Sequence, residues 1–115
     1  MRLVIVFGSR ARETASDVSD WDVAVLSEHQ LSAEEKADIA PQVARMLNVS
    51  EDCVDIVDLW SAPPLLQYRV AQEGKLLYGK EFDFLRFRVR AWKRYQDTAR
   101  LRNARERALA KRYAE

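Results

Sequence analysis

The feature that most constrains the fold is an unbroken run of β-branched and aromatic residues near the start of the chain. Leu3–Phe7 (LVIVF) contains no polar residue and ends at Gly8. A continuous apolar run of this length indicates a strand that is buried on both faces, because a half-exposed strand alternates apolar and polar residues. The run is far shorter than the ~20 residues that a membrane span requires, so we expect no membrane segment.

Three later segments also predict strands. Asp20–Leu26 and Cys53–Leu59 are rich in valine and isoleucine, and Lys75–Tyr78 has the length of a short edge strand. A helix is expected between the last two, because Pro64 suits a first helical turn and Gly74 suits a helix end. The alternation of strands with helices predicts an α/β (α+β) fold with a short mixed sheet backed by helices.

The segment between the second and third strands predicts a helix with a defined start. Ser32 is followed by Glu35 at capping-box spacing, and alanine and leucine then recur at helical intervals. Pro41 lies inside this pattern and removes one backbone donor. We therefore expect either a kink or two short helices here.

A long C-terminal helix is predicted from about Glu81, and it carries two apolar stripes. The region of Trp92 and Tyr95 is expected to pack in the core. Two stripes exceed what a small domain can cover, however, so we expect one of them to dock on another chain. The first stripe is Phe82, Leu85, Val89, Trp92 and Ala99, and the second is Phe84, Phe87, Ala91 and Tyr95.

Length and composition limit the chain to one compact domain with carboxylate-based metal chemistry. Its 115 residues, 48% of them hydrophobic, suffice for one core. We divide them into a core at residues 1–79 and a basic helix at 80–115, which either belongs to the same domain or extends it for docking. Cys53 and His29 are the only residues of their types, so neither a disulfide nor a zinc site can form within the chain. These features favour a cytoplasmic protein that uses Mg²⁺ or Mn²⁺.

Charge is divided unevenly along the chain. Residues 1–85 hold 8 Lys/Arg and 15 Asp/Glu, whereas residues 86–115 hold 11 and 3. The basic C-terminal segment has two interpretations, a solvated helix end stabilised by i,i+4 pairs or a contact with RNA.

The residues that indicate chemistry are a Gly-Ser pair and an Asp-x-Asp motif ten residues later. Gly8 lets the backbone approach a ligand closely, and Ser9 can donate to phosphate oxygens together with the amides that open the next helix. Asp20 and Asp22 are two residues apart in a predicted strand, so their side chains project on the same face. Carboxylates so placed repel each other unless a divalent cation lies between them, which predicts a Mg²⁺ site on the open face of the sheet.

A third carboxylate is expected from the third strand. Two-metal phosphoryl transfer uses a further carboxylate to activate the attacking hydroxyl. Asp55 and Asp58 are three residues apart and face opposite sides of the sheet, so only one can join the other two. We assign Asp55, because it is central and flanked by Val54 and Ile56, where a carboxylate is costly without a partner. Asp58 is expected to be solvated or to cap a turn.

These motifs resemble the minimal nucleotidyltransferase (MNT) family of the DNA polymerase beta superfamily, over about residues 3–78. The resemblance implies that Gly8 and Ser9 bind a triphosphate, that Asp20 and Asp22 bind two Mg²⁺ ions, and that Asp55 is the third metal-binding carboxylate. The best-known members are antitoxins of HEPN/MNT toxin-antitoxin pairs. It therefore also implies ATP as donor, transfer of AMP, and a tyrosine hydroxyl of the HEPN ribonuclease as acceptor.

Several alternatives stay open. Arg10 and Arg12 are candidates for triphosphate contacts, but they could equally be solvated on a short exposed helix. The sequence departs from the family at Glu13 and Trp21, and no helix precedes the first strand, which suggests a shortened start or a partner over that face. The rival functions are an antitoxin that acts by binding alone, transfer to a small molecule, and transfer to RNA.

Overall fold

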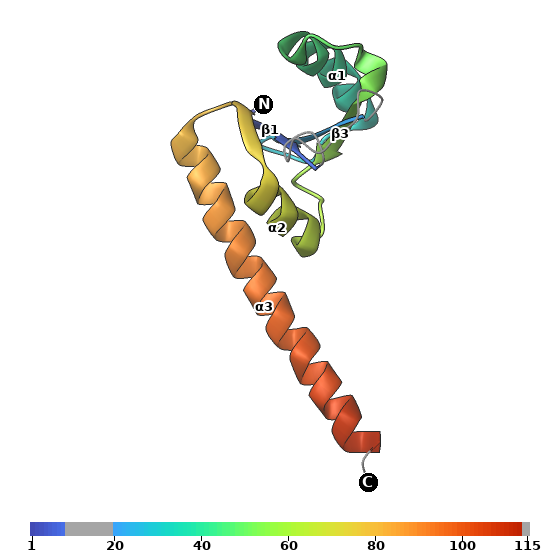
Figure 1. The fold of residues 1–115 in the computed structure, drawn as a ribbon, viewed down its shortest axis with the longest axis vertical. Helices are drawn as coiled ribbons and strands as arrows, with labels where there is room; N and C mark the ends of the chain where they lie inside the picture. The colour runs from blue at the N-terminus through green and yellow to red at the C-terminus, as the bar shows by residue number, and fades with distance from the viewer. Residues whose placement is uncertain (9–19, 114–115) are drawn as a thin grey trace.

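The computed structural model describes residues 1–8 and 20–113 of the chain. Strands and helices alternate through most of this part, as the sequence predicts (Figure 1). A short 3-10 turn, which the sequence did not indicate, precedes the third strand. The elements are β1 (Leu3–Phe7), β2 (Trp21–Leu26), α1 (Ala33–Leu47), η1 (Glu51–Cys53), β3 (Val54–Asp58), α2 (Pro64–Glu73), β4 (Lys75–Tyr78) and α3 (Glu81–Tyr113).

The four strands form one mixed sheet in the order β3-β2-β1-β4. β1 is antiparallel to both β2 and β4, and β2 is parallel to β3. All five residues of β1 are buried, which confirms the prediction from its unbroken apolar run. β4 is an edge strand, also as predicted.

Hydrophobic residues cover both faces of the sheet, so the expectation of an open face is wrong. Alternate residues of each strand enter two separate clusters because successive side chains of a strand point to opposite faces. One cluster contains Leu3, Ile5, Phe7 and Ala24 with Val70 of α2 and Phe87 and Ala91 of α3. The other contains Val4, Val6, Val23 and Val25 with Ile39 and Val43 of α1.

Helix α1 is one continuous helix, so the alternative of two short helices is wrong. Ser32 and Glu35 form the predicted capping box, and Asn48 closes the helix in a left-handed conformation with its N–H donating to the carbonyls of Ala44 and Arg45. Pro41 lies inside the helix. An interior proline costs about 3 kcal/mol, but the capped ends and the burial of Ile39, Val43 and Ala44 outweigh that cost.

Gly74 ends α2 as predicted, but not through a left-handed conformation, since its φ is −70°. A Cβ atom on Gly74 would collide with the backbone carbonyl of Val70 and with the side chain of Ile5. Glycine is required because α2 turns directly into β4 while lying against the central strand.

Helix α3 extends well beyond the α/β part (Figure 1). The whole molecule, with this helix, measures 60 × 31 × 26 Å. The second stripe of α3 packs inward: Phe87 and Ala91 are buried, and the ring of Tyr95 stacks on Tyr68 of α2 with centroids 4.1 Å apart. Its first stripe is exposed, from Phe82 at 67% to Trp92 at 53%. The expectation that Trp92 packs in the core is therefore wrong.

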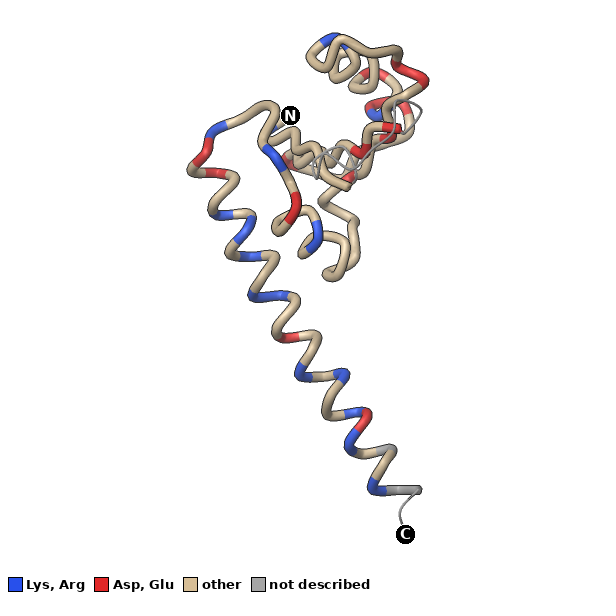
Figure 2. The backbone as a smooth tube through the Cα atoms, in the orientation of Figure 1, with Lys and Arg blue, Asp and Glu red and all other residues tan. Residues whose placement is uncertain are grey.

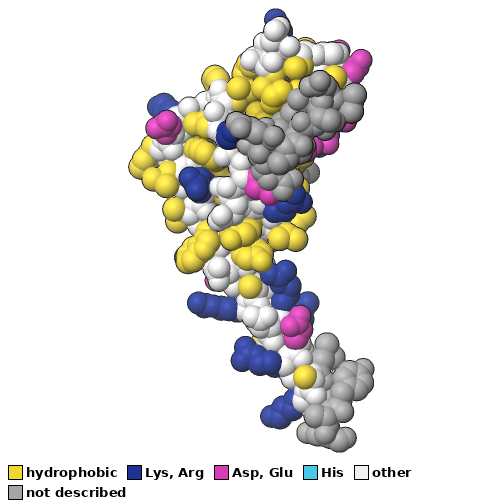
Figure 3. All heavy atoms as spheres, in the orientation of Figure 1, with side chains coloured by type: hydrophobic (Ala, Val, Ile, Leu, Met, Phe, Trp, Pro, Cys, Tyr) yellow, Lys and Arg dark blue, Asp and Glu magenta, His cyan; other side chains and the backbone are white. Residues whose placement is uncertain are grey.

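The basic residues of α3 follow the projecting helix, and most acidic residues lie in the α/β part (Figure 2). In the space-filling view, hydrophobic side chains gather around the first half of α3 and basic side chains project from its second half (Figure 3). Within the described part of the chain, no helix is long and apolar enough to cross a membrane.

Candidate active site

Two of the three predicted carboxylates lie side by side at one end of the sheet. Asp22 of β2 is in register with Asp55 of β3, and its partner on the other side is Phe7 of β1. Phe7 points into the cluster under α2 and α3, so Asp22 and Asp55 share that face. Asp20 is exposed and directly precedes β2, two residues from Asp22 and therefore of the same parity.

The electrostatics of Asp22 show that its carboxyl senses the other two carboxylates. The pKa of the Asp22 carboxyl is raised above 3.8, first by burial and then by the negative charges of Asp55 and Asp20. The positive charge of Arg69 partly opposes this rise. The structure thus assembles an anionic site from residues on two strands that are far apart in sequence.

Arg69 is a site residue that the sequence did not indicate. It lies on α2 with an exposed side chain, close enough to influence the charge of Asp22. Helical periodicity marks position 69 only as a polar position on a helix surface. Its proximity to Asp22 depends on how α2 packs against β1, which is a tertiary feature.

Gly8 lies so close to the Asp22 carboxylate that no side chain fits between them. It has a φ of +75°, and a Cβ atom there would come within 2.5 Å of Oδ2 of Asp22. Any other residue would therefore be strained and would displace the Asp22 carboxylate. Gly8 therefore lies directly against Asp22, and its approach to a ligand stays a prediction.

The remaining predicted site residues, Ser9 and Arg10, lie outside the described residues, as does Arg12. Within residues 1–8 and 20–113, no group of three or more His, Cys, Asp or Glu side chains is arranged to hold a metal ion. The donor set still suits a hard divalent cation, because adjacent carboxylates of Asp22 and Asp55 repel each other and a cation would relieve that repulsion.

Asp58 acts at a turn, which is one of its two predicted roles, but its side chain is buried. Its side chain is only 4% exposed, so it is not solvated. Oδ2 accepts hydrogen bonds from the backbone N–H of Leu31 at 3.1 Å and the hydroxyl of Ser61 at 3.1 Å, and Oδ1 accepts one from the N–H of Trp60 at 3.0 Å. It therefore fixes the turn after β3, whereas Asp55, expected to be the costly buried carboxylate, is exposed.

Family comparison agrees with this arrangement. A sequence model described as "Polymerase beta, Nucleotidyltransferase" matches residues 1–83, well over half of the chain. The chain therefore belongs to the polymerase beta nucleotidyltransferase family.

Its relatives within that family are named protein adenylyltransferase MntA. The protein of that name from Shewanella oneidensis is 34% identical over 96 residues, which cover 84% of this chain and 67% of the relative. The one from Aphanizomenon flos-aquae is 33% identical over 104 residues, which cover 77% and 66%. The chain thus spans about two-thirds of the length of these relatives. These similarities confirm the resemblance to the MNT family.

Comparison with solved structures also supports the resemblance to the MNT family. A crystal structure of a toxin-antitoxin with AMP-PNP superposes with a TM-score of 0.75 at 32% identity, covering 95% of this chain and 86% of that chain. A tri-AMPylated HEPN toxin of Shewanella oneidensis in complex with its MNT antitoxin gives 0.68 at 30% identity, covering 95% and 82%. The predicted fold class is confirmed.

Proposed function

We propose that this chain is the antitoxin of a HEPN/MNT pair and transfers AMP from ATP to a tyrosine hydroxyl of the HEPN ribonuclease. The observation that carries the proposal is the anionic site, in which Asp22 and Asp55 are in register and the pKa of Asp22 is raised by burial and by the charges of Asp55 and Asp20. A binding protein without activity gains nothing from such repulsion, so the site favours catalysis over neutralisation by contact alone.

Asp20, Asp22 and Asp55 would hold Mg²⁺ in this reaction. Bound Mg²⁺, with two ions as the expected number, neutralises charge on the phosphates and lowers the pKa of the attacking hydroxyl. Asp55 is the exposed member of the in-register pair and can therefore reach an acceptor that arrives from outside the chain. We assign it the proton of the tyrosine hydroxyl, whose oxygen then attacks the α-phosphorus as pyrophosphate leaves.

The triphosphate would lie beside Gly8, whose backbone comes close to the Asp22 carboxylate. Ser9 and Arg10 are our candidates for contacts to it. Arg69 of α2 adds a positive charge on the same side and is a further candidate. Because the reaction consumes ATP, and because the single Cys53 indicates no disulfide chemistry, we assign it to the cytoplasm.

The toxin would dock on the exposed apolar stripe of α3. Phe82, Leu85, Val89 and Trp92 are all more than half exposed on the side away from the core. Exposed aromatic residues in a continuous row are typical of protein interfaces. The solved complexes similar to this chain contain a toxin partner, which supports an occupant of this kind.

Mass spectrometry of the toxin tests the proposed transfer. A HEPN toxin should be incubated with this chain and Mg·ATP, and its tyrosines should then be examined for AMP. We expect AMP on tyrosine only when ATP, Mg²⁺ and this chain are all present. An unmodified toxin together with a nucleotide added to RNA would contradict the tyrosine acceptor and favour transfer to RNA through the basic helix.

Calorimetry tests the proposed metal site separately. The Asp20→Asn, Asp22→Asn double variant removes two of the carboxylates and should lose Mg²⁺-dependent ATP binding. Glu51→Gln with Asp52→Asn removes two exposed carboxylates outside the site and serves as a control of equal net charge. Equal Mg·ATP affinity in the double variant and the control would show that these carboxylates do not hold the metal.

A further inference from the structure

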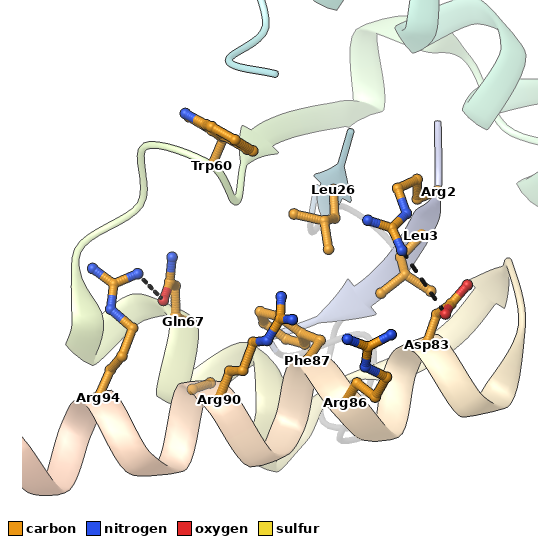
Figure 4. Close-up of a pocket in the computed structure, with 11 residues that line it drawn as sticks. Arg2, Leu3, Leu26, Trp60, Gln67, Asp83, Arg86, Phe87, Arg90 and Arg94 are labelled. Carbon is orange, nitrogen blue, oxygen red and sulfur yellow. Dashed lines mark hydrogen bonds and ion pairs between the residues drawn. The ribbon is translucent and has the colours of Figure 1, made fainter. Parts of the chain in front are cut away.

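We propose that a cavity apart from the carboxylate site, lined by four arginines, binds a nucleoside phosphate. It has a volume of about 390 Å³ and lies between α3 and the ends of β1 and β2, with residues of α2 and the loop before it at its edge (Figure 4). A volume of this size falls in the range of small-molecule sites. The arginines are Arg2, Arg86, Arg90 and Arg94.

This cavity is separate from the carboxylate site. Its strand residues are Leu3 and Leu26, which pair with each other at one end of β1 and β2, whereas Asp22 pairs with Phe7 at the other end. Four residues of extended strand separate the two positions, a distance of ~13 Å. The two sites also have opposite charge, since among the described residues that line the cavity Asp83 is the only acidic one, against four arginines.

The arginine furthest along α3 is held in place by a buried amide. Nη1 of Arg94 donates to Oε1 of Gln67 at 3.0 Å, and Nε2 of Gln67 donates to the carbonyl of Leu59 at 2.8 Å. Gln67 is 6% exposed, so this connection fixes the guanidinium of Arg94 to the body of the protein. The positive charge at the rim is therefore preorganised, which lowers the entropic cost of binding an anion.

The other arginines leave donors available for a ligand. With the described residues, the side chain of Arg2 makes only a long ion pair, to Asp83 at 3.9 Å. Arg86 and Arg90 point from α3 toward the strand ends (Figure 4). In the described part of the chain, Arg90 has no ion pair or hydrogen bond with another side chain, so its guanidinium is free to bind an anion.

The rest of the lining selects an anion that carries a flat apolar group. Leu3, Leu26, Phe87 and Ala91 give the cavity an apolar floor, and the indole of Trp60, which is 55% exposed, stands on the opposite side from α3 (Figure 4). An aromatic ring across a cavity from guanidinium groups suits a nucleobase and its phosphate, since bases stack on aromatic side chains. The phosphate would bind Arg86 and Arg90, and the base would lie toward Trp60. Such a nucleotide could be free or part of a single-stranded RNA.

Binding of AMP without Mg²⁺ tests this site apart from the carboxylate site. The Asp20→Asn, Asp22→Asn double variant serves as background, and AMP, inorganic phosphate and a short single-stranded RNA are titrated by calorimetry. Arg90→Gln removes one charged donor pair and keeps a helix-forming side chain, so it should weaken AMP binding at least about tenfold. Arg88→Gln on the same helix, outside the cavity, should leave the affinity at the level of the background.

The titrations have distinct consequences. Loss of both AMP and RNA binding in Arg90→Gln, with RNA the tighter ligand, supports the site and identifies RNA as the source of the nucleotide. The same loss with AMP as the tighter ligand supports the site and identifies a free nucleotide as its ligand. Equal affinity for AMP and inorganic phosphate would overturn the nucleoside part of the proposal, and AMP binding that is absent or insensitive to Arg90→Gln would overturn the site itself.

Discussion

Single residues in β2 and β3 illustrate what strand parity can predict and what it cannot. Parity correctly placed Asp22 and Asp55 on one face and Asp58 on the other, because alternation is a property of every strand. Strand parity could not predict which of these carboxylates is buried. Asp58 is buried because the N–H of Leu31 comes from a distant loop and the hydroxyl of Ser61 comes from the turn after the strand, and no local sequence pattern indicates the contact with Leu31.

The raised pKa of Asp22 predicts a pH-dependent effect of Asp22→Asn. A carboxyl with a raised pKa binds its proton more tightly in the folded state, so the free energy of unfolding falls as the pH rises above the unfolded value of 3.8. Without metal, Asp22→Asn should therefore raise the Tm at pH 7, and the difference should disappear below pH 3.8. Calorimetric melting across this range checks it, and a lower Tm for the variant at pH 7 would contradict the raised pKa of Asp22.

Asp58→Asn should destabilise the fold, in contrast to Asp55→Asn. Both carboxylate oxygens of Asp58 accept hydrogen bonds from donors, so an asparagine in either orientation turns its NH₂ against a donor. We expect a loss of ~1–3 kcal/mol in the free energy of unfolding. Asp55 is exposed, and its replacement should leave the midpoint of urea unfolding near that of the wild type. Similar midpoints for the two variants would refute the structural role of Asp58.

At the scale of elements, the sequence predicted well where the helices and strands lie. It predicted less well whether a helix is continuous. The capping box of Ser32 and Glu35 and the glycine after α2 are local signals, and both define helix ends as predicted. Pro41 is also a local signal, but its effect is opposed by packing of Ile39 and Val43 against the sheet. The same holds for α3, where the sequence showed two stripes, and only the position of α2 determines which one is buried.

Pro41→Ala should stabilise α1. Proline lacks the N–H that would donate to the carbonyl four residues earlier, and alanine restores that donor in a helix whose ends are already capped. We expect a gain of ~1–3 kcal/mol in the free energy of unfolding, measured by chemical denaturation. A variant no more stable than the wild type would indicate that the helix has adapted to the proline at little cost.

At the scale of the whole molecule, the charge division predicted from the sequence becomes a spatial one, with a basic helix projecting from an acidic α/β body (Figure 2). The apolar run of β1 predicted burial on both faces of that strand, but the helices that cover each face were not predicted, because this requires α1 to lie opposite α2 and α3. The arginine-lined cavity was also invisible in the sequence, since Arg2 and Arg94 come from opposite parts of the chain.

The docking proposal is best tested with surface variants. Deletion of residues 80–115 would also remove Phe87 and Ala91 from the core, so loss of the toxin complex could then reflect unfolding. Val89→Asp with Trp92→Asp changes only exposed positions and should abolish co-purification with the toxin while preserving the circular dichroism spectrum. Arg102→Glu, further along α3, serves as a control. An intact complex in the double variant would place the interface elsewhere.

The central claim is that the carboxylate site of β2 and β3 catalyses AMP transfer, and transfer of label from α-³²P-ATP to the toxin tests it most directly. The wild type and Asp52→Asn should label the toxin, whereas Asp55→Asn should lose at least about a hundredfold in rate while still binding Mg·ATP. Labelling by Asp55→Asn at the rate of the wild type would contradict the account.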